Sequence, residues 1–317
     1  MDRVCILMPL FNDWASAQIL IPRIDKAVTA WQSRITLVMV DDGSKDPMPE
    51  ADQLIGDSTH IAEVRVIHLT RNRGHQRAIA VGLAYAHGRG DFSAVYVMDS
   101  DGEDPPEELE DLRRAGLQHP EAIVTADRAS RSEGPLFRLG YRCYRLLFRL
   151  LTGVAIRFGN FCRIPAVQLE RLVHYADLWN SLSGCIKKSH LPTTGIPSHR
   201  AVRYIGPSKM NLMALVLHGL NAVAVFHETA LVRMLLIIAL AAGVAAAGWL
   251  ASLFGSAAAG VAAWGLLLAM VLLTGMVLLA VTLAQLQGRS RFKEGPAAFW
   301  QSQVRQIAAL REPRSES

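Results

Sequence analysis

Two aspartates in the middle of the chain have the type and spacing to hold a divalent cation. Asp99 and Asp101 stand two residues apart, directly after the apolar run Ala94–Met98. Carboxylate oxygens are ligands that Mg²⁺ and Mn²⁺ prefer, and such a cation bridges readily to a diphosphate, whose growing charge it would neutralise as the diphosphate departs. A bare Asp-x-Asp is common by chance. Its place after an apolar run and before Gly102-Glu103-Asp104-Pro105 makes the prediction specific.

The aspartate pair follows the last of four short apolar runs in the first hundred residues. These runs are Val4–Met8, Ile35–Val40, Val64–Leu69 and Ala94–Met98. They are almost continuously apolar, which is typical of strands buried on both faces of a mainly parallel sheet. Helices are predicted between them at Ala15–Trp31 and Gln76–His87, and a third begins at Pro105-Pro106. The alternation indicates an α/β fold with ligand sites at the carboxyl ends of the strands.

A polar cluster follows each predicted strand. The clusters are Pro9–Asn12, Asp41–Ser44, Arg71–Gly74 and Asp99–Asp104. Because the carboxyl ends of parallel strands meet at one edge of the sheet, we expect the four loops to converge on one site.

The C-terminal third has a different composition. The whole chain is 51% apolar and 19% charged, yet no Asp, Glu, Lys or Arg occurs between Arg233 and Arg289. Segments 234–254 and 257–284 are each long enough for a hydrocarbon core of about 30 Å. Basic residues flank only the outer ends, so the positive-inside rule places both termini in the cytoplasm. The alternative is a buried helical hairpin in a soluble protein, which a charge-free run of this length disfavours.

A second candidate membrane element precedes this segment. In residues 136–152, four arginines recur at spacings of four, three and four, which puts them on one helical stripe. They are Arg138, Arg142, Arg145 and Arg149. Either this is a solvated basic face, or the helix lies on an anionic leaflet, each arginine contributing on the order of 1 kcal/mol. The membrane anchor favours the second interpretation.

Charge pattern and cysteine spacing favour neither nucleic-acid binding nor a cysteine metal site. The net charge is +5, but no Lys/Arg block or helix-turn-helix pattern indicates nucleic-acid binding. The four cysteines form no metal-binding spacing and are expected to be reduced thiols of a cytoplasmic domain. The apolar stretch that ends at Pro9 is too short for a signal peptide.

The motifs together resemble family 2 glycosyltransferases of the GT-A fold, in particular the polyprenyl-phosphate sugar transferases, which include the dolichyl-phosphate mannose synthases and bactoprenol glucosyltransferases. The resemblance covers residues from about 4 to 210. It is carried by Pro9-x-x-Asn12, Val40-Asp41-Asp42-Gly43-Ser44, Leu69-Thr70-Arg71-Asn72-x-Gly74, Asp99-x-Asp101-Gly102-Glu103-Asp104-Pro105-Pro106-Glu107 and Gly206-x-Ser208-Lys209. The charge-free C-terminal segment resembles the two-helix anchor of bacterial members.

This resemblance implies roles for individual residues. The nucleoside pocket would be lined by Pro9, Phe11, Asn12, Asp41 and Asp42, and the rest of the nucleotide-sugar site would include Arg71, Gly74 and Ser100. Asp99, Asp101 and Glu103 would lie at a Mg²⁺ or Mn²⁺ ion and the diphosphate. Arg128 and Arg138 would meet the acceptor phosphate or donor diphosphate, and Arg203 and Lys209 would close over the site. For each arginine, the alternative is a surface or lipid-facing residue.

Two positions depart from the family pattern. Many relatives have Gly-Asp-Phe-Arg where this chain has Gly159-Asn160-Phe161-Cys162, so an acidic role there does not transfer. His75 either touches phosphate or caps the following helix, and the cap is favoured slightly.

The resemblance implies an inverting transfer in a single displacement. A phosphate oxygen of a polyprenyl phosphate would attack the anomeric carbon of a nucleotide-diphosphate sugar, with a UDP-sugar favoured and a GDP-sugar possible. That oxygen is already anionic, so a general base is less necessary; Asp104 is the candidate base, or else the N-cap of the helix after it. Alternatives are transfer to a hydroxyl of a lipid, glycan or protein, and a non-catalytic scaffold that binds nucleotide or lipid. A transporter is disfavoured because the apolar segment holds no ionisable residue.

The predicted organisation has four parts. They are a GT-A domain at 1–205, a juxtamembrane segment at 206–232, two transmembrane helices within 233–286 and a cytoplasmic basic tail at 287–317. The expected location is the bacterial inner membrane, with the catalytic domain in the cytoplasm; a homo-oligomer is compatible with the sequence.

Overall fold

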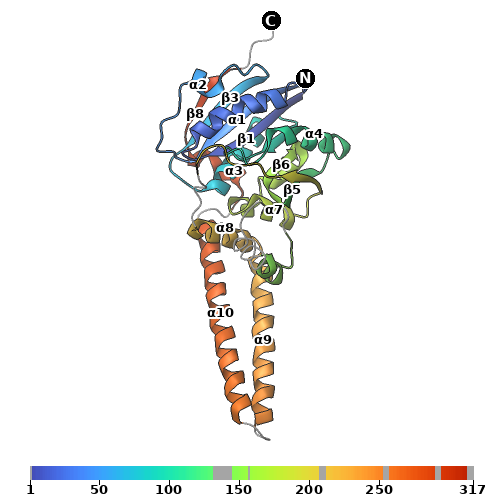
Figure 1. Cartoon of the computed structure of the whole chain (residues 1–317), viewed down its shortest axis with the longest axis vertical. Coiled ribbons are helices and arrows are strands. Elements are labelled where there is room, and N and C mark those ends of the chain that lie inside the picture. Colours follow the sequence, from blue (N-terminus) through green and yellow to red (C-terminus); the bar gives the residue numbers. More distant parts are fainter. Residues whose placement is uncertain are drawn as a thin grey trace. The chain divides into compact units, whose positions relative to one another are not determined.

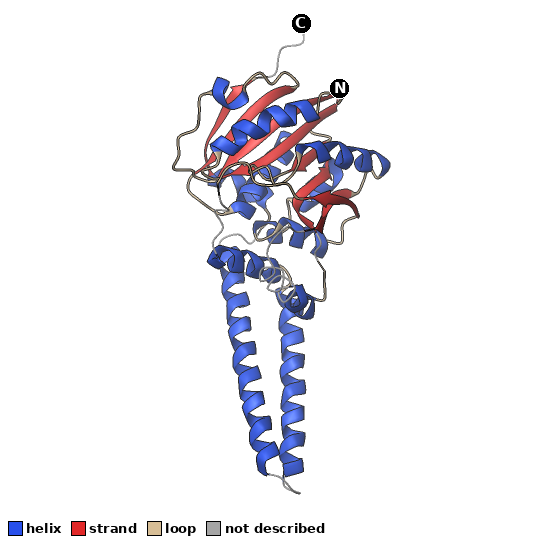
Figure 2. Ribbon diagram, in the orientation of Figure 1, coloured by secondary structure: helices blue, strands red, loops and turns tan. Residues whose placement is uncertain are grey.

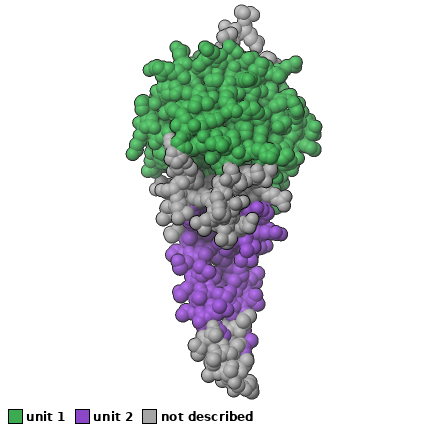
Figure 3. All heavy atoms as spheres, viewed as in Figure 1, with its two compact units in different colours: residues 1–132, 156–211, 292–317 green, residues 133–155, 212–291 purple. Residues whose placement is uncertain are grey.

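The computed structural model describes residues 2–130, 145–155, 158–206, 212–252, 257–289 and 294–312. The chain divides into two compact units (Figure 3). Unit 1 comprises residues 1–132, 156–211 and 292–317, and unit 2 comprises residues 133–155 and 212–291.

Unit 1 is built on one eight-stranded sheet with the strand order β7-β5-β6-β4-β1-β2-β3-β8 (Figures 1 and 2). The strands are β1 (Asp2–Leu10), β2 (Ser33–Asp41), β3 (Ile61–Leu69), β4 (Ala94–Val97), β5 (Ile123–Ser130), β6 (Phe158–Pro165), β7 (Thr193–His199) and β8 (Val304–Arg311). Strands β1 to β4 form a parallel group, and β7 is parallel to β5. The antiparallel pairs are β4–β6, β5–β6 and β3–β8. The expectation of an α/β fold with a mainly parallel sheet is confirmed.

The four predicted strands are β1 to β4, and their burial explains why they could be predicted. Alternate residues of β1 pack on opposite faces: Leu7 lies in the core beneath α3 (His75–Arg89), and Ile6 lies in the core beneath α1 (Trp14–Ala27). Both side chains are fully buried, so a strand covered on both faces has no polar positions to alternate. The predicted helices at Ala15–Trp31 and Gln76–His87 are these same α1 and α3.

The close approach of α3 to the sheet depends on a glycine. A Cβ at Gly82 would lie 2.3 Å from Leu7 Cδ1 and 2.9 Å from Val40 Cγ2. The absent side chain lets α3 press against β1 and β2, which fixes the first turn of α3 beside the carboxyl ends of the strands.

The remaining short elements of unit 1 connect the strands. They are α2 (Ala51–Ile55), the 3-10 turn η1 (Pro106–Glu108), α4 (Leu109–Gln118), α6 (Ala166–Leu172), η2 (Ala176–Trp179), α7 (Leu182–Lys188), α11 (Pro296–Phe299) and η3 (Trp300–Gln303). The predicted third helix therefore begins as η1 and continues as α4.

Residues 294–312, within the segment predicted as a basic tail at 287–317, belong to unit 1 and include a strand of its sheet, which corrects the prediction of a separate tail. Its β8 pairs with β3, and Thr70 N donates to Gln303 O at 2.9 Å. Trp300 packs edge-on against Tyr85 of α3, with 5.7 Å between ring centroids. Trp179 Nε1 donates to Glu294 O at 3.1 Å. Charged residues on both sides of Ala308-Ala309-Leu310 hide this strand from a search for apolar runs.

Unit 2 is helical. It contains α8 (Leu212–Ala224), α9 (His227–Ser252), α10 (Ala257–Arg289) and a helical stretch at 145–152. Helices α9 and α10 run side by side (Figure 2). Within the described residues, one stretch is long and apolar enough to cross a membrane, Ala263–Thr282 of α10, of which 6% is buried. Two helices are therefore present where two spans were predicted, while crossing by α9 stays a prediction.

The described part of the predicted interfacial helix begins at residue 145, so Arg138 and Arg142 lie outside the described residues. Arg145 and Arg149 are exposed, and Leu146, Leu147 and Leu150 are exposed beside them. Phe148 is buried and packs against Phe226, with 6.0 Å between ring centroids.

Candidate functional site

Hydrogen bonds join the loops after β1 and β2. Asn12 adopts a positive φ of 50°, a conformation that asparagine tolerates better than most residues. Its backbone N–H donates to Ser44 Oγ at 2.8 Å, and its side-chain Oδ1 accepts from Lys45 N at 2.7 Å. Asn12 therefore fixes the second loop against the first, a positioning role beyond the pocket-lining role implied by the family.

Asp42 joins the loop after β2 to the loop after β3. Its carboxylate is 3% exposed and accepts backbone N–H bonds from Arg73 at 2.6 Å and Gly74 at 2.8 Å. Burial raises the pKa of Asp42 to about 6, and the two N–H donors only partly offset this. A Cβ at Gly43 would lie 2.6 Å from Asn72 N, so the two loops also touch through their backbones.

Asp41 is likewise engaged inside the protein. Its Oδ1 accepts from Ser44 N at 2.9 Å, and its Oδ2 lies 2.8 Å from His68 Nδ1. Although burial acts to raise the pKa of Asp41, the bonds from His68 and Ser44 outweigh it and leave the pKa lowered. Both aspartates predicted at the nucleoside thus bond to protein groups that shape the loops.

The loop after β4 holds the predicted cation ligands. Asp99 N donates to Asp104 Oδ2 at 2.8 Å, and Glu103 N donates to Asp101 Oδ1 at 3.0 Å. Asp104 is buried, and the N-cap residue of the next turn, η1, is Pro105, so the N-cap prediction for Asp104 is not confirmed. Burial and the neighbouring Asp99 carboxylate raise the pKa of Asp101 to about 6. The loop therefore concentrates negative charge in a partly buried place.

Residues 200–206, which we call the strap, lie against this loop. Arg203 Nη1 donates to Asp101 Oδ2 at 3.0 Å, and its Nη2 pairs with Asp13. The main chain of the strap adds a bond from Tyr204 N to Asp101 O at 3.0 Å. Arg200 forms an ion pair with Glu103. Two predicted cation ligands, Asp101 and Glu103, thus face arginines of the strap.

His75, the first residue of α3, also faces the loop. Its Nε2 lies 3.2 Å from Asp99 Oδ1 and 2.9 Å from Asn160 Nδ2. Burial lowers the pKa of His75, but the Asp99 carboxylate outweighs this and leaves the pKa raised. The favoured role of His75 as a helix cap is not confirmed, because the N-cap residue of α3 is Gly74, and no side chain makes a capping bond there. Gln76, which sequence reasoning missed, donates from Nε2 to Asn160 Oδ1 at 3.0 Å.

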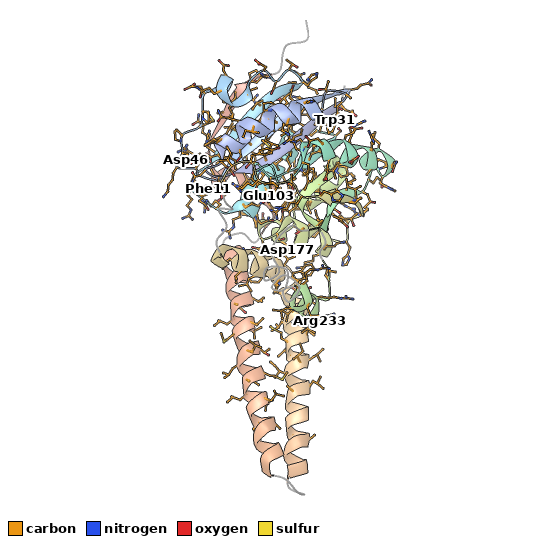
Figure 4. All side chains as sticks on the ribbon, viewed as in Figure 1. Phe11, Trp31, Asp46, Glu103, Asp177 and Arg233 are labelled. Atoms are coloured by element: carbon orange, nitrogen blue, oxygen red, sulfur yellow. The ribbon has the colours of Figure 1, made fainter. Side chains whose placement is uncertain are left out.

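The other predicted residues have varied surroundings. Pro9 and Ser100 are buried, whereas Phe11 and Arg71 are exposed at loops after β1 and β3. Phe11 and Glu103 lie toward the same end of the sheet (Figure 4). The backbone of Arg128 on β5 pairs opposite Ser198 of β7, and its side chain is not described. Arg138 and Lys209 lie outside the described residues.

The donor set fits a cation that is completed by phosphate oxygens. No group of three or more His, Cys, Asp or Glu side chains is placed to hold a metal ion within the described ranges. Mg²⁺ is commonly bound by one or two carboxylates plus substrate phosphates. Asp99 and Asp101 supply such a pair of carboxylates. The two carboxylates repel each other, and a bound cation would relieve this repulsion.

Comparisons with known proteins agree with this geometry. The sequence profile named Glycosyl transferase family 2 matches residues 5–172. The chain is 30% identical over 264 residues to the undecaprenyl-phosphate 4-deoxy-4-formamido-L-arabinose transferase of Pseudomonas aeruginosa (strain LESB58), covering 80% of this chain and 73% of the relative. The enzyme of the same name from Yersinia enterocolitica serotype O:8 is 26% identical over 218 residues, covering 68% of this chain and 64% of the relative.

A solved structure shares the fold. Glucosyl-3-phosphoglycerate synthase from Mycobacterium tuberculosis, in complex with Mn²⁺, UDP-glucose and phosphoglyceric acid, superposes with a TM-score of 0.51 at 14% identity. The match covers 72% of this chain and 80% of the synthase. With its strand-end loops and its match to the family profile, the chain belongs to glycosyl transferase family 2 and is a glycosyltransferase.

Proposed function

We propose that this glycosyltransferase moves a sugar from a nucleotide-diphosphate sugar to a polyprenyl phosphate at the cytoplasmic face of a bacterial inner membrane. The observation that carries the proposal is the aspartate loop at the carboxyl ends of β1–β4, with Arg203 beside Asp101. The names of the relatives support the acceptor, because both are undecaprenyl-phosphate transferases.

Donor binding divides between residues that touch the nucleotide-sugar and residues that shape the loops. Phe11 is exposed at the strand ends and would stack on or border the nucleoside, with Pro9 behind it. Asp41, Asp42, Asn12 and Gly74 would act through the loops they join. Arg71 and Ser100 complete the proposed donor site.

Asp99 and Asp101 would hold Mg²⁺ or Mn²⁺ together with the donor diphosphate, and Glu103 would add charge beside them. When bound, the cation stabilises the negative charge of the departing nucleoside diphosphate. Arg203 would pass from Asp101 to the diphosphate as the donor enters, since a guanidinium pairs equally well with carboxylate and phosphate. Lys209 would close over the donor site beside Arg203.

The reaction we propose is a single displacement with inversion. An anionic phosphate oxygen attacks the anomeric carbon as the bond to the nucleoside diphosphate breaks. Arg128 and Arg138 would hold the acceptor phosphate. Asp104 is committed to Asp99 N, so we assign it to positioning the loop; positioning and charge neutralisation supply most of the catalysis.

The path of the chain supports a two-span anchor. Unit 1 contains residues on both sides of the α8–α10 segment, because β8 pairs with β3. A folded unit lies on one side of a bilayer, so the number of crossings between its parts must be even. If Ala263–Thr282 spans, a second helix must span too, and the 26 residues of α9 reach about 39 Å, longer than a hydrocarbon core of about 30 Å.

The helical stretch at 145–152 supports contact with the membrane surface. Three exposed leucines beside two exposed arginines are the composition of a helix that lies in an anionic interface. Such contact would keep the site near the head groups of the acceptor lipid.

A second candidate is transfer to a hydroxyl acceptor, which Asn160 favours because the familiar acidic residue is absent at that position. Membranes containing the protein should be incubated with labelled UDP- and GDP-sugars, with undecaprenyl phosphate or with hydroxylated acceptors, and with or without Mn²⁺. We expect label in the lipid phosphate only, and none with Asp101→Asn. Activity that survives this substitution or full chelation contradicts the cation, and a product formed only on a hydroxyl contradicts the acceptor.

A further inference from the structure

Arg203 of the strap is bound at every nitrogen of its guanidinium group. Its Nη1 donates to Asp101 Oδ2 at 3.0 Å, its Nη2 pairs with Asp13, and its Nε donates to Ile205 O at 3.0 Å. The side chain of Arg203 is 13% exposed. The guanidinium is therefore fixed between the loop after β1 and the aspartate loop, and it cannot turn away without breaking these bonds.

Tyr204 holds the strap in this place. Its ring covers Gly102, where an added Cβ would lie 2.5 Å from Cε2 of the ring. The hydroxyl of Tyr204 accepts from Arg23 Nη1 at 2.6 Å, and its backbone N–H donates to Asp101 O at 3.0 Å. Since Gly102 stands between Asp101 and Glu103, the ring lies on the loop that carries the proposed cation ligands.

The bonds of Asp101 put the strap and a cation in competition. Asp101 Oδ1 accepts from Glu103 N at 3.0 Å, and Oδ2 accepts from Arg203. A cation on Oδ2 would lie against the guanidinium, and two positive charges so close repel each other strongly where solvent is largely excluded. A donor diphosphate changes this balance, because its oxygens offer the guanidinium another partner of matching geometry.

We propose that Arg203, held in place by Tyr204, closes the Asp101 carboxylate to a cation until a nucleoside diphosphate binds. The strap would thus make cation binding depend on the nucleotide. This rests on the proposed function, in which Asp101 is a cation ligand and Arg203 passes to the diphosphate. It gives Arg203 a role before the donor arrives, and it makes Tyr204 a positioning residue.

The test measures Mn²⁺ binding to the full-length protein in detergent by electron paramagnetic resonance, first without nucleotide and then with UDP. Without UDP, we expect Arg203→Met to bind Mn²⁺ about 10-fold or more tightly than wild type, the factor that a hydrogen bond to a charged group typically supplies. With UDP, the difference should be smaller, because Arg203 then bonds to the diphosphate. A damaged fold would weaken binding, so it cannot imitate the expected gain.

Two variants of Tyr204 test its positioning role. Tyr204→Ala removes the ring from Gly102 and should also tighten Mn²⁺ binding without UDP, by a smaller factor than Arg203→Met. Tyr204→Phe keeps the ring, so it should bind Mn²⁺ more weakly than Tyr204→Ala. If Tyr204→Ala binds Mn²⁺ like wild type, the role of Tyr204 is overturned.

The matched control is Lys45→Met, which removes the same charge from the exposed loop after β2. It should leave Mn²⁺ affinity almost unchanged, because salt screens exposed charges. Equal Mn²⁺ affinities of Arg203→Met and wild type without UDP would overturn the role of the strap. An equal gain from Lys45→Met would overturn it too, since loss of any nearby positive charge would then suffice.

The Mn²⁺ measurements separate a failure of the cation site from a failure of the strap. If wild type binds no Mn²⁺ even with UDP, the proposed cation site is wrong, and the role of the strap falls with it. If wild type binds Mn²⁺ with UDP and Asp101→Asn abolishes this binding, the cation site stands. Arg203→Met that gains nothing without UDP would then refute the role of the strap alone.

Discussion

Glu63 offers a quantitative test of how unit 1 is held together. It lies on β3 with a side chain that is fully buried, and three arginines bond to it: Arg89 at 2.7 Å, Arg65 at 2.8 Å and Arg3 at 3.0 Å. All lie toward the amino ends of the central strands, at the opposite edge of the sheet from the aspartate loop. We predict that Glu63→Gln destabilises the protein without changing its substrate affinity.

The magnitude follows from the electrostatics. Burial alone would raise the pKa of Glu63, but the bonds and charges of Arg89 and Arg65 outweigh it and lower the pKa from 4.5 to about 2. A pKa that falls from 4.5 to about 2 on folding corresponds, at 1.36 kcal/mol for each tenfold change in proton affinity, to about 3 kcal/mol of folding stability. Breaking a buried ion pair by removing one partner costs roughly 3–5 kcal/mol, which agrees.

The sign of the pH dependence is also determined. Because the pKa is lower in the folded state, this stability is fully present above the unfolded value of 4.5 and is lost as pH falls toward about 2. Glu63→Gln should therefore lower the free energy of unfolding at pH 7. Between pH 4.5 and 2, the free energy of unfolding should fall less steeply for this variant than for the wild type.

Urea unfolding followed by tryptophan fluorescence measures the effect, with Glu170→Gln as the control. Glu170 is an exposed carboxylate on α6, where a substitution usually changes stability by less than about 0.5 kcal/mol. A loss of less than about 1 kcal/mol for Glu63→Gln, or an equal loss for Glu170→Gln, would show that the three arginines do not stabilise unit 1 through Glu63.

Three further predictions address the site and its support. Arg203→Met should raise the KM for the nucleotide-sugar about 10-fold or more in steady-state assays, since a charged hydrogen bond is worth roughly 1.5–3 kcal/mol; an unchanged KM would show that the strap does not reach the donor. Gly82→Val should cost at least about 1–3 kcal/mol in urea unfolding, because its Cβ overlaps Leu7, and a neutral effect would contradict the close packing of α3. Deleting residues 292–317 should expose the edge of β3 and make unit 1 sensitive to limited proteolysis, whereas a chain in which a flexible linker replaces 212–291 should keep β8 and stay resistant.

The elements that the sequence predicts best are those with one dominant physical cause. Strands β1 to β4 are buried on both faces, so unbroken apolar runs such as Ile35–Val40 identify them directly. The convergence of their loops follows from parallel topology alone. The bonds between Asn12 and Ser44 and between Asp42 and Gly74 join the first three loops. Arg203, which bonds to both Asp13 and Asp101, links the first loop to the fourth.

The features that the sequence could not predict depend on the direction of side chains and on partners that are distant along the chain. Asp41 and Asp42 have the residue types of a ligand site, but only the structure shows their carboxylates turned toward His68 and the loop backbone. Gln76 looks like an ordinary helix residue, because its partner Asn160 is 84 positions away. Strand β8 could not be predicted, because its partner β3 lies on the other side of the apolar segment in the sequence.

The identity of the product tests the proposed sugar transfer most directly. Purified protein should be incubated with UDP- and GDP-sugars, undecaprenyl phosphate and Mn²⁺, and the lipid fraction analysed by mass spectrometry. We expect undecaprenyl phosphate whose mass has increased by one sugar residue, with release of nucleoside diphosphate and no product from Asp101→Asn. Unmodified lipid with every UDP- and GDP-sugar, or a sugar found only on a hydroxyl acceptor, would contradict the proposed transfer.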